Sequence, residues 1–468
     1  MSPAHRIARF VLSAALAAAT WLAPVPCCFA QIAGGGGQNG GQAGAGGILV
    51  DAQGVVRAAS ERDKTGRLDR KRREQLAARA LPGDVNVSSP IRKVSLAGVE
   101  AACEKYAQNR EHVPSDLHYL AGLQRIDYVF VDPDRHDIII AGPAEGFAIT
   151  PAGRALGNAS GRPPLRLDDL LIALRSLDGR QATIGCSIDP IQENLARFKS
   201  FVSRDRGVIS PAQAKAKFAK LGAVLGLQNV RIFGVPPDSH FAEVLLAADI
   251  AMKRLAIGID RPPIRGFRSH LALVGAGENT MQRWWLSPLY DPFVKSGDGL
   301  AFAFHGPRVR LQSEEQLVAD SGTYTAASFM HPSARKFSQQ FTERYPELAD
   351  AAPVFAELHG LFDLAILAAL LEKERLFERA GWRMTLFLDE DRADLVKRPV
   401  PRQIHSVSNY KTIGKSLYVA QVSGGVTIDA GHVLPAAEFT SDPEGKLAGA
   451  RGEALAPEKP EQHPWWWD

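Results

Sequence analysis

The sequence predicts a mixed α/β fold in which helices cover a mixed β-sheet, followed by a second region built from a β-hairpin and helices. Two observations carry this prediction. Apolar, β-branched runs recur between Val87 and Gly258, and each of them is stopped by proline, which cannot continue a hydrogen-bonded ladder. Amphipathic helical stretches alternate with these runs, and such alternation favours a sheet covered by helices. A mixed α+β arrangement is the alternative.

The composition is that of a globular protein without a nucleic-acid partner. The 468 residues correspond to roughly two or three domains at ~150 residues each. Hydrophobic residues make up 45% and charged residues 23% of the chain, which is ordinary for a folded protein. The formal net charge is only +4, and no basic stripe is interleaved with aromatic residues, so nucleic-acid binding is not expected.

Residues 1–30 have the three parts of a secretory signal peptide. Arg6 and Arg9 give a basic start, an apolar run rich in alanine and leucine follows, and small residues end at Ala30. The apolar run is too short and too rich in alanine for a membrane span of ~20 residues. We therefore expect export to the periplasm, cell surface or extracellular space, with a flexible glycine-rich linker over 31–47.

The four cysteines fall into two groups. Cys27 and Cys28 lie within the signal peptide, where a lipoprotein-type cleavage would be the alternative to ordinary cleavage. Cys103 and Cys186 remain in the mature chain. A lone pair of cysteines in an exported protein is more often a disulfide than a catalytic thiol, so a Cys103–Cys186 bond is predicted.

Residues 48–258 form the predicted α/β domain. A β-hairpin begins it, with Gln53-Gly54 as its turn, and a charged surface helix lies between Ser60 and Ala80. The basic run of that helix, RLDRKRR at 67–73, is either a solvated face or an anionic docking patch. Three strands then end at proline: Tyr128–Val131, Thr183–Ile188 and Val230–Val235.

The helices of this domain have recognisable starts. Ser210-Pro211-Ala212-Gln213 is a capping box with proline at the first helical position. Asp238 or Ser239 is expected to cap a helix whose apolar stripe runs from Phe241 to Leu255. Asp249 and Lys253 are four residues apart on the other face, which predicts a surface ion pair.

The second region, 259–435, contains predicted strands around Trp284-Trp285, Leu300–Phe304 and Arg308–Leu311, and then helices over Ser333–Phe377. It either forms a separate region or packs as one unit with the first. The tail 436–468 is polar and is expected to be disordered until Trp465, Trp466 and Trp467. Three adjacent indoles form an unusual apolar patch when exposed, so we expect them to anchor an envelope or protein partner, with docking onto their own domain as the alternative.

Several long strings resemble an uncharacterised family of exported planctomycete proteins that is classed only as a domain of unknown function. The strings are GGILVDAQGVVR, YVFVDPDRHDIIIAGPAEGF, TIGCSIDPIQENLARF, NVRIFGVPPDSHFAEVLLAADIAMKRLAIG, MQRWWLSPLY and FTERYPELADAAPVFAEL. The resemblance extends from about Gly46 to Leu434. It implies export and the fold of that family, but no activity, cofactor or catalytic residue.

Asp238, Ser239 and His240 are the best candidate site in the sequence. They follow a strand end and begin a helix, where ligands bind in open α/β sheets and where free backbone N–H groups attract anions. His240 would then be a general base or an anion contact. Helix capping explains the same residue types, with His240 as a first-turn surface residue.

Asp132 and Asp189 are further ligand-binding candidates, because each lies where a strand meets proline. Asp132, Asp134 and Asp137 could hold a cation, but their spacing lacks the features of an EF-hand loop. A plain hairpin turn explains the first group, and a helix cap explains Asp189. Neither a metal nor another cofactor is predicted.

Common catalytic motifs are missing from the sequence: there is no Gly-x-Ser-x-Gly elbow, His-Glu-x-x-His helix, phosphate-binding loop or Gly-x-Gly-x-x-Gly turn. The sequence therefore favours an exported, non-catalytic binding or structural component of the envelope or extracellular space. A hydrolase or transferase is the alternative, with its site at Asp132, Asp189 and His240. A cleft shared by these three residues would favour the enzyme, and scattered positions would favour a binding protein.

Overall fold

The computed structural model describes residues 47–50, 56–59 and 67–468, apart from short stretches of which 177–182, 204–209, 319–323, 435–438 and 457–463 are the longest. The predicted signal peptide and all of the predicted linker except Gly47 lie outside the described residues. The chain divides into two units, Met1–Arg62 and Asp63–Asp468. The described part of the smaller unit is the predicted hairpin, β1 (Gly47–Val50) antiparallel to β2 (Val56–Ala59).

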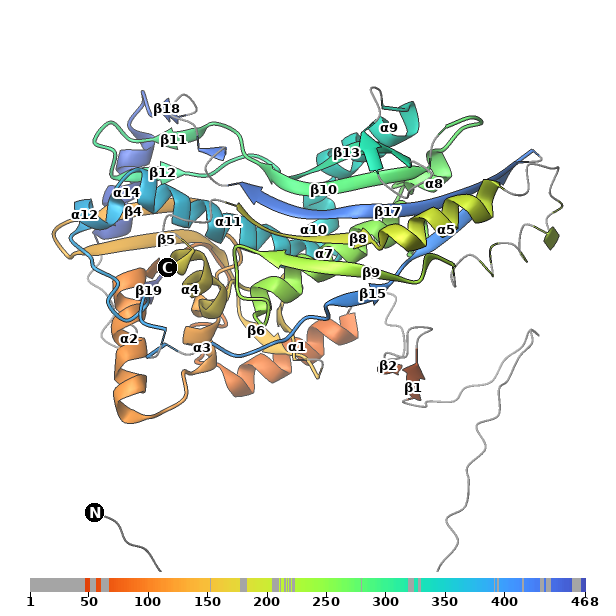
Figure 1. The fold of residues 1–468 in the computed structure, drawn as a ribbon. Coiled ribbons are helices and arrows are strands. Elements are labelled where there is room, and N and C mark those ends of the chain that lie inside the picture. Colours follow the sequence, from red (N-terminus) through yellow and green to blue (C-terminus); the bar gives the residue numbers. More distant parts are fainter. Residues whose placement is uncertain are drawn as a thin grey trace, which may run out of the picture. The chain divides into compact units, whose positions relative to one another are not determined.

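The larger unit contains two large sheets and has the mixed α/β fold that the sequence predicts (Figure 1). The first sheet has the order β14-β13-β10-β17-β8-β9-β15, and β16 pairs with β17. β10 and β17 are parallel, and the other pairs are antiparallel. Its strands are β8 (Thr183–Pro190), β9 (Leu227–Phe233), β10 (Met281–Leu289), β13 (Arg308–Val318), β14 (Tyr324–Ala326), β15 (Gln403–His405), β16 (Ser408–Ile413) and β17 (Ser416–Asp429).

The second sheet has the order β18-β11-β12-β4-β5-β3-β19. Only its β11–β18 pair is parallel among the described pairings. Its strands are β3 (Ser89–Ser95), β4 (Tyr128–Asp132), β5 (Asp137–Ala144), β11 (Phe293–Lys295), β12 (Ala301–Ala303), β18 (Phe439–Ser441) and β19 (Trp466–Trp467), and a small separate pair consists of β6 (Phe147–Ile149) and β7 (Ala155–Gly157).

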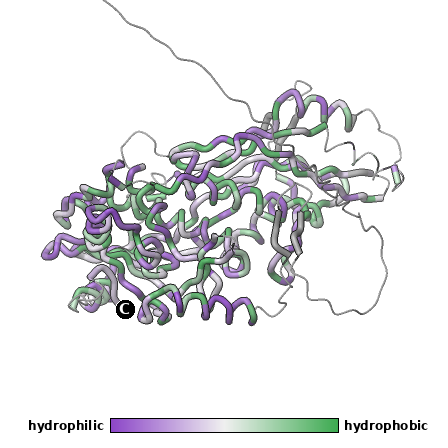
Figure 2. The backbone as a smooth tube through the Cα atoms, turned by 90° about the horizontal axis from the view of Figure 1, so that it is seen from below, coloured by the Kyte–Doolittle hydropathy of each residue, from purple (hydrophilic) through white to green (hydrophobic). Residues whose placement is uncertain are grey.

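Helices pack on and between these sheets, with hydrophobic stretches gathered in the interior and hydrophilic ones mainly at the margin (Figure 2). They are α1 (Arg67–Ala80), α2 (Leu96–Asn109), α3 (Ser115–His118), α4 (Leu167–Arg175), α5 (Gln192–Ser203), α7 (His240–Ala256), α8 (His270–Leu273), α9 (Pro332–Glu343), α10 (Tyr345–Ala351), α11 (Pro353–Lys373), α12 (Leu376–Ala380) and α14 (Lys446–Leu455).

Both sheets combine strands from before and after residue 258, and in each sheet the earlier strands lie between later ones. β17 lies between β8 and β10 in the first sheet, and β12 pairs with β4 in the second. Because neither sheet is complete without strands from both predicted regions, Asp63–Asp468 folds as one unit.

The predicted cap of α7 is present, because Ser239 accepts from the Ala242 amide. Ser95 caps α2 in the same way by accepting from the Gly98 amide. The predicted capping box is also present, because the Gln213 side chain accepts from the Ser210 amide and the Ser210 hydroxyl from the Gln213 amide.

α7 differs from the prediction on its second face. Asp249 and Lys253 form a buried ion pair at 2.7 Å, not a surface pair. The Lys253 ammonium also donates to the Gly424 carbonyl of β17 at 3.2 Å. α7 is covered by β8 and β17 as well as by α4 and α11, so both of its faces are buried. The bonds of Lys253 to the Asp249 carboxylate and to backbone carbonyls offset the cost of burying the two charges.

α11 is the central core helix of the larger unit (Figure 1). Among the described residues it is the one helix long and apolar enough to span a membrane, but 83% of its most apolar window is buried within the protein. It packs on α4, α7, α10, α12 and β13. A helix that is apolar all round and covered on every side is a core helix of the fold.

The C-terminal tail is folded where it is described, which corrects the prediction of a disordered tail with an exposed anchor. Trp465, Trp466 and Trp467 are buried, and β19 pairs antiparallel with β3. The Arg92 guanidinium stacks 4.4 Å from the Trp466 ring and donates to the Asp468 carboxylate at 2.8 Å. Docking onto the chain's own domain, the alternative interpretation, is therefore what the structure contains.

We expect Trp466→Ala to lower the free energy of unfolding by about 3 kcal/mol or more, as for other buried tryptophans. Deleting residues 464–468 should cost more, because it also removes the ion pair of Arg92. Urea denaturation measures both effects, and Val113→Ala at a partly exposed position is the control, expected within about 0.5 kcal/mol of the wild type. If the deletion variant were as stable as the wild type, the tryptophans would not stabilise the fold, and the interpretation as an exposed anchor would be correct.

Candidate functional site

The segment 162–169 (RPPLRLDD) brings charged side chains into the protein interior. Arg162, Arg166, Asp168 and Asp169 are each less than 10% exposed. Each lies beside a histidine from another element: His118 of α3, His240 of α7 or His359 of α11. We call these seven residues the histidine cluster. Because charged side chains are almost never fully buried without partners, this segment is the most unusual electrostatic feature of the fold.

His240 and Asp169 form the tightest pair of the histidine cluster. The His240 Nδ1 lies 2.8 Å from the Asp169 Oδ2, and both side chains are buried. His240 is the first residue of α7, and Asp169 lies in the first turn of α4. In the neutral ring Nδ1–H donates to the carboxylate, so Nε2 is the nitrogen that can accept a proton or a hydrogen bond. This is the geometry by which a carboxylate orients a histidine base.

His118 is held as a neutral ring. The Arg166 guanidinium donates to its Nε2 at 3.0 Å, and its Nδ1 faces the Asp168 carboxylate at 3.9 Å. Burial lowers the pKa of His118 below its usual value, and the Arg166 charge lowers it further against the opposing effect of Asp168. A proton on Nε2 would remove the acceptor of Arg166 and place a second cation beside it.

His359 is in the same situation on α11. The Arg162 guanidinium lies 3.3 Å from its Nδ1, while its Nε2 is 3.6 Å from the Asp363 carboxylate. Burial and the Arg162 charge hold the pKa of His359 well below its usual range. Asp363 accepts from the Ile126 amide and the Tyr290 hydroxyl, so this part of the histidine cluster ties α11 to the second sheet.

Glu357 adds an acid beside the His240–Asp169 pair. Its carboxylate pairs with Arg154 at 3.1 Å. Burial raises the pKa of Glu357, Arg154 and His240 lower it, and Asp169 raises it again. One oxygen of Glu357 and one of Asp169 are buried without a hydrogen-bond partner among the described residues. A site with two acids of different environment around one histidine can perform acid–base chemistry.

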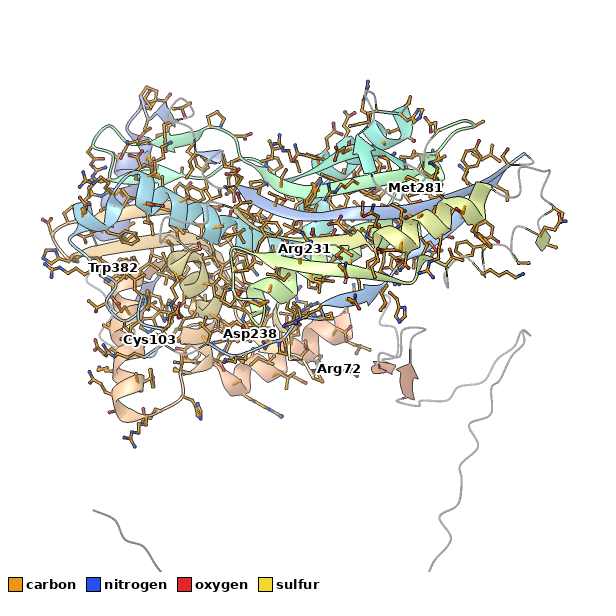
Figure 3. The ribbon with its side chains drawn as sticks, in the orientation of Figure 1. Arg72, Cys103, Arg231, Asp238, Met281 and Trp382 are labelled. Atoms are coloured by element: carbon orange, nitrogen blue, oxygen red, sulfur yellow. The ribbon has the colours of Figure 1, made fainter. Side chains whose placement is uncertain are left out.

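A pocket of about 410 Å³ lies next to this pair. Asp169, Ile172 and Ser176 follow one face of α4 at helical spacing, and the last two line the pocket. Arg175 of α4 also lines it, and the other lining residues come from the turn after β9 and from between α12 and β15: Gly234, Pro236, Asp238, Ser239, Glu390, Leu395 and Lys397. We call it the α4 pocket; Asp238, labelled in Figure 3, lies on its wall.

The structure separates the candidate residues that the sequence grouped. Asp238 and Ser239 line the α4 pocket next to buried His240. Asp189 lies opposite Asn229 near the start of β9 and pairs with Arg283 at 3.3 Å, so it is at the other end of the strand that leads to His240. Asp132 is in the second sheet, where it accepts from the Arg135 amide. Neither Asp132 nor Asp189 lines the α4 pocket.

The hydroxyl groups at the α4 pocket already form hydrogen bonds within the protein, and the Cys186 thiol is not activated as a nucleophile. Ser239 donates to the Pro236 carbonyl and caps α7, and Ser176 donates to the Ala173 carbonyl. Burial raises the pKa of the Cys186 thiol, which makes a thiolate nucleophile unfavourable. No group of three histidine, cysteine or acidic side chains among the described residues is placed to hold a metal ion.

The predicted disulfide is absent. Cys103 and Cys186 are both buried free thiols. Cys103 lies on α2, which packs on the second sheet (Figure 3), whereas Cys186 is in the middle of β8 in the first sheet. The prediction placed the helix of Cys103 on the sheet of Cys186, and the chain has two separate sheets instead.

Sequence reasoning missed Arg162, Arg166, Asp168 and Asp169. The one available indication was a pair of prolines between arginines directly before a helix with acids in its first turn. Those acids satisfy helix-dipole rules and are usually exposed, so their sequence positions gave no reason to expect burial.

We expect His118→Gln to change how stability depends on pH, because the glutamine oxygen can accept from Arg166 as His118 does but the side chain does not titrate. Below pH ~6.5 the unfolded chain protonates this histidine, while the lowered pKa prevents protonation of the folded form. The wild type should therefore lose stability relative to the variant as the pH falls, by up to about 1.4 kcal/mol per pH unit. Urea denaturation at pH 7.5, 6 and 5 measures the difference, with His112→Gln at an exposed position as the control. If the stability of His118→Gln and of the wild type changed in parallel with pH, the prediction would be wrong.

Comparison with known proteins gives a partial match to one family and no function. Residues 186–270 match the model of a family described as "Protein of unknown function (DUF1598)". No curated protein and no solved structure matches the chain. The matched region contains Asp238, Ser239 and His240 but not the segment 162–169. The match covers less than half of the chain, so residues 186–270 are similar to this family of unknown function.

Proposed function

We propose that this chain is an exported, non-catalytic binding protein whose ligand occupies the α4 pocket. The observation that carries the proposal is the pocket itself. Its volume of about 410 Å³ is within the range of small-molecule sites, and charged and hydroxyl side chains from α4, the β9–α7 turn and the segment 390–397 converge on it. Export rests on the signal-peptide pattern of residues 1–30.

The histidine cluster supports binding by making the pocket rigid. Asp169 joins the first turn of α4 to the start of α7 through His240. α4 and the turn that precedes α7 both carry pocket residues. A site whose walls are held before the ligand arrives loses less conformational entropy on binding. The scattered positions of Asp132 and Asp189 also favour a binding protein over an enzyme built from the strand ends.

We expect small polar fragments to bind the α4 pocket, detected as NMR shift changes that cluster at Ser176, Asp238 and Lys397. Ser176→Tyr should abolish these changes by filling the pocket. Ser338→Tyr is a matched control, because Ser338 is a half-buried helical serine that also donates to the carbonyl three residues before it. Fragments that bind elsewhere, or bind Ser176→Tyr equally well, would refute the proposal.

An acid–base enzyme is the second candidate, and the His240–Asp169 pair specifically favours it. His240 would remove a proton from a ligand that reaches it from the α4 pocket, and Glu357, with its raised pKa, would supply one. This would be a hydrolase or transferase centred on His240 without Asp132 and Asp189.

The two candidates differ in what happens to the bound molecule. For a binding protein we expect a fragment that occupies the α4 pocket to be recovered chemically unchanged after prolonged incubation, as judged by mass spectrometry. Conversion by the wild type but not by His240→Gln, with binding retained in the variant, would establish the enzyme instead.

A further inference from the structure

A second pocket adjoins the α4 pocket and shares part of its wall. It has a volume of about 470 Å³ and lies between α4, the end of α11, α12 and the segment 384–390. Arg175 and Glu390 line both pockets. We call the second one the α12 pocket. A molecule that extends past these two side chains would occupy both spaces at once.

Two charged side chains, Arg175 and Glu100, hold the chain segment that separates the two pockets. The Arg175 guanidinium donates to the carbonyls of Phe387, Asp389 and Ala393, at 2.7 to 3.2 Å. Behind the same segment, the buried Glu100 carboxylate accepts from the Leu386 amide at 2.7 Å. Because an arginine binds the carbonyls and a glutamate binds an amide, the segment is fixed without a ligand.

The α12 pocket has an apolar wall beside a charged one. The apolar wall consists of Leu174, Leu371, Phe377, Met384 and Leu388, and the charged lining residues are Arg175, Glu372, Arg375, Glu378 and Glu390. Leu388 is 50% exposed, although a leucine is more stable when it is covered than when it faces water. An apolar group in this pocket would cover Leu388.

The α4 pocket also presents charges of both signs, and its apolar lining is smaller. Asp238 and Glu390 supply carboxylates, and Lys397 supplies an ammonium. None of these three forms an ion pair within the described residues, whereas Glu378 and Arg375 at the α12 pocket pair with each other. A ligand that itself carries both an ammonium and a carboxylate would complement the α4 pocket.

We infer that the ligand is a short peptide with a large apolar side chain. The side chain occupies the α12 pocket, and the peptide's charged termini lie in the α4 pocket between Asp238 and Lys397. A fatty acid or a simple amine carries only one sign of charge and leaves part of the α4 pocket uncompensated. This inference rests on the proposed function, because it assigns a ligand class to the same site.

Isothermal titration of the full chain with dipeptides tests the inference. Glycyl-phenylalanine should bind at least tenfold more tightly than glycyl-glycine, which lacks the apolar group. Leu388→Asp should abolish that difference in affinity. Lys397→Glu should weaken the binding of glycyl-phenylalanine at least fivefold. Val396→Asp is the matched control, since Val396 is 55% exposed and lines neither pocket; it should retain the wild-type preference.

Other results would overturn the inference. If 2-phenylethanol, which carries the ring but no charge, binds as tightly as glycyl-phenylalanine, the ligand is not a peptide. An unchanged preference in Leu388→Asp would remove the α12 pocket from the site. If fragments bind the α4 pocket but neither dipeptide does, the inference fails and the proposed function stands; if the fragments also fail to bind there, both fail.

Discussion

The burial of four charges in the segment 162–169 is the constraint on which the centre of this fold depends. A buried charge without partners costs several kcal/mol, so each of these side chains requires a partner in a particular place. Arg166 and Asp168 require His118 on α3, Asp169 requires His240 on α7, and Arg162 requires His359 on α11. The positions of these helices around α4 therefore depend on polar contacts as well as on apolar packing. Two of the charges have further partners, because Arg162 also pairs with Asp350 and Arg166 with Asp168.

The same principle fixes the surface features that we connect with function. Glu100 on α2 and Arg175 on α4 approach the segment 382–393 and satisfy its amides and carbonyls. That segment supplies Met384, Leu388 and Glu390 to the α12 pocket, and Glu390 also lines the α4 pocket. Charges that would be costly alone thus hold an irregular part of the chain in one conformation, which is what a binding site built on a loop requires.

The C-terminal tail covers an edge of the second sheet. β3 would otherwise present an unpaired edge, and exposed edges pair readily with other chains. β19 covers this edge, and Trp467 donates to the Ala454 carbonyl of α14. Arg92 then neutralises Asp468 while stacking on Trp466. The tryptophans have a structural role within the chain, although their composition suggested an interaction surface.

The sequence by itself determined the local elements: the mixed α/β class, the strand ends at proline, the cap of α7 and the capping box at Ser210. These depend on neighbouring residues, because a strand break, a cap or an apolar stripe is complete within a few positions. Only the tertiary structure decided the partners of buried polar groups. His240 and Asp169 are 71 residues apart, Glu100 and Trp382 are 282 apart, and Arg92 and Asp468 are 376 apart. Asp249 and Lys253 have a surface spacing but face two layers of the fold at once. Cys103 lies on α2 against the second sheet, whereas Cys186 lies in the first sheet. Spacing along the chain specifies which face of a helix a residue occupies, but what covers that face depends on elements hundreds of residues away.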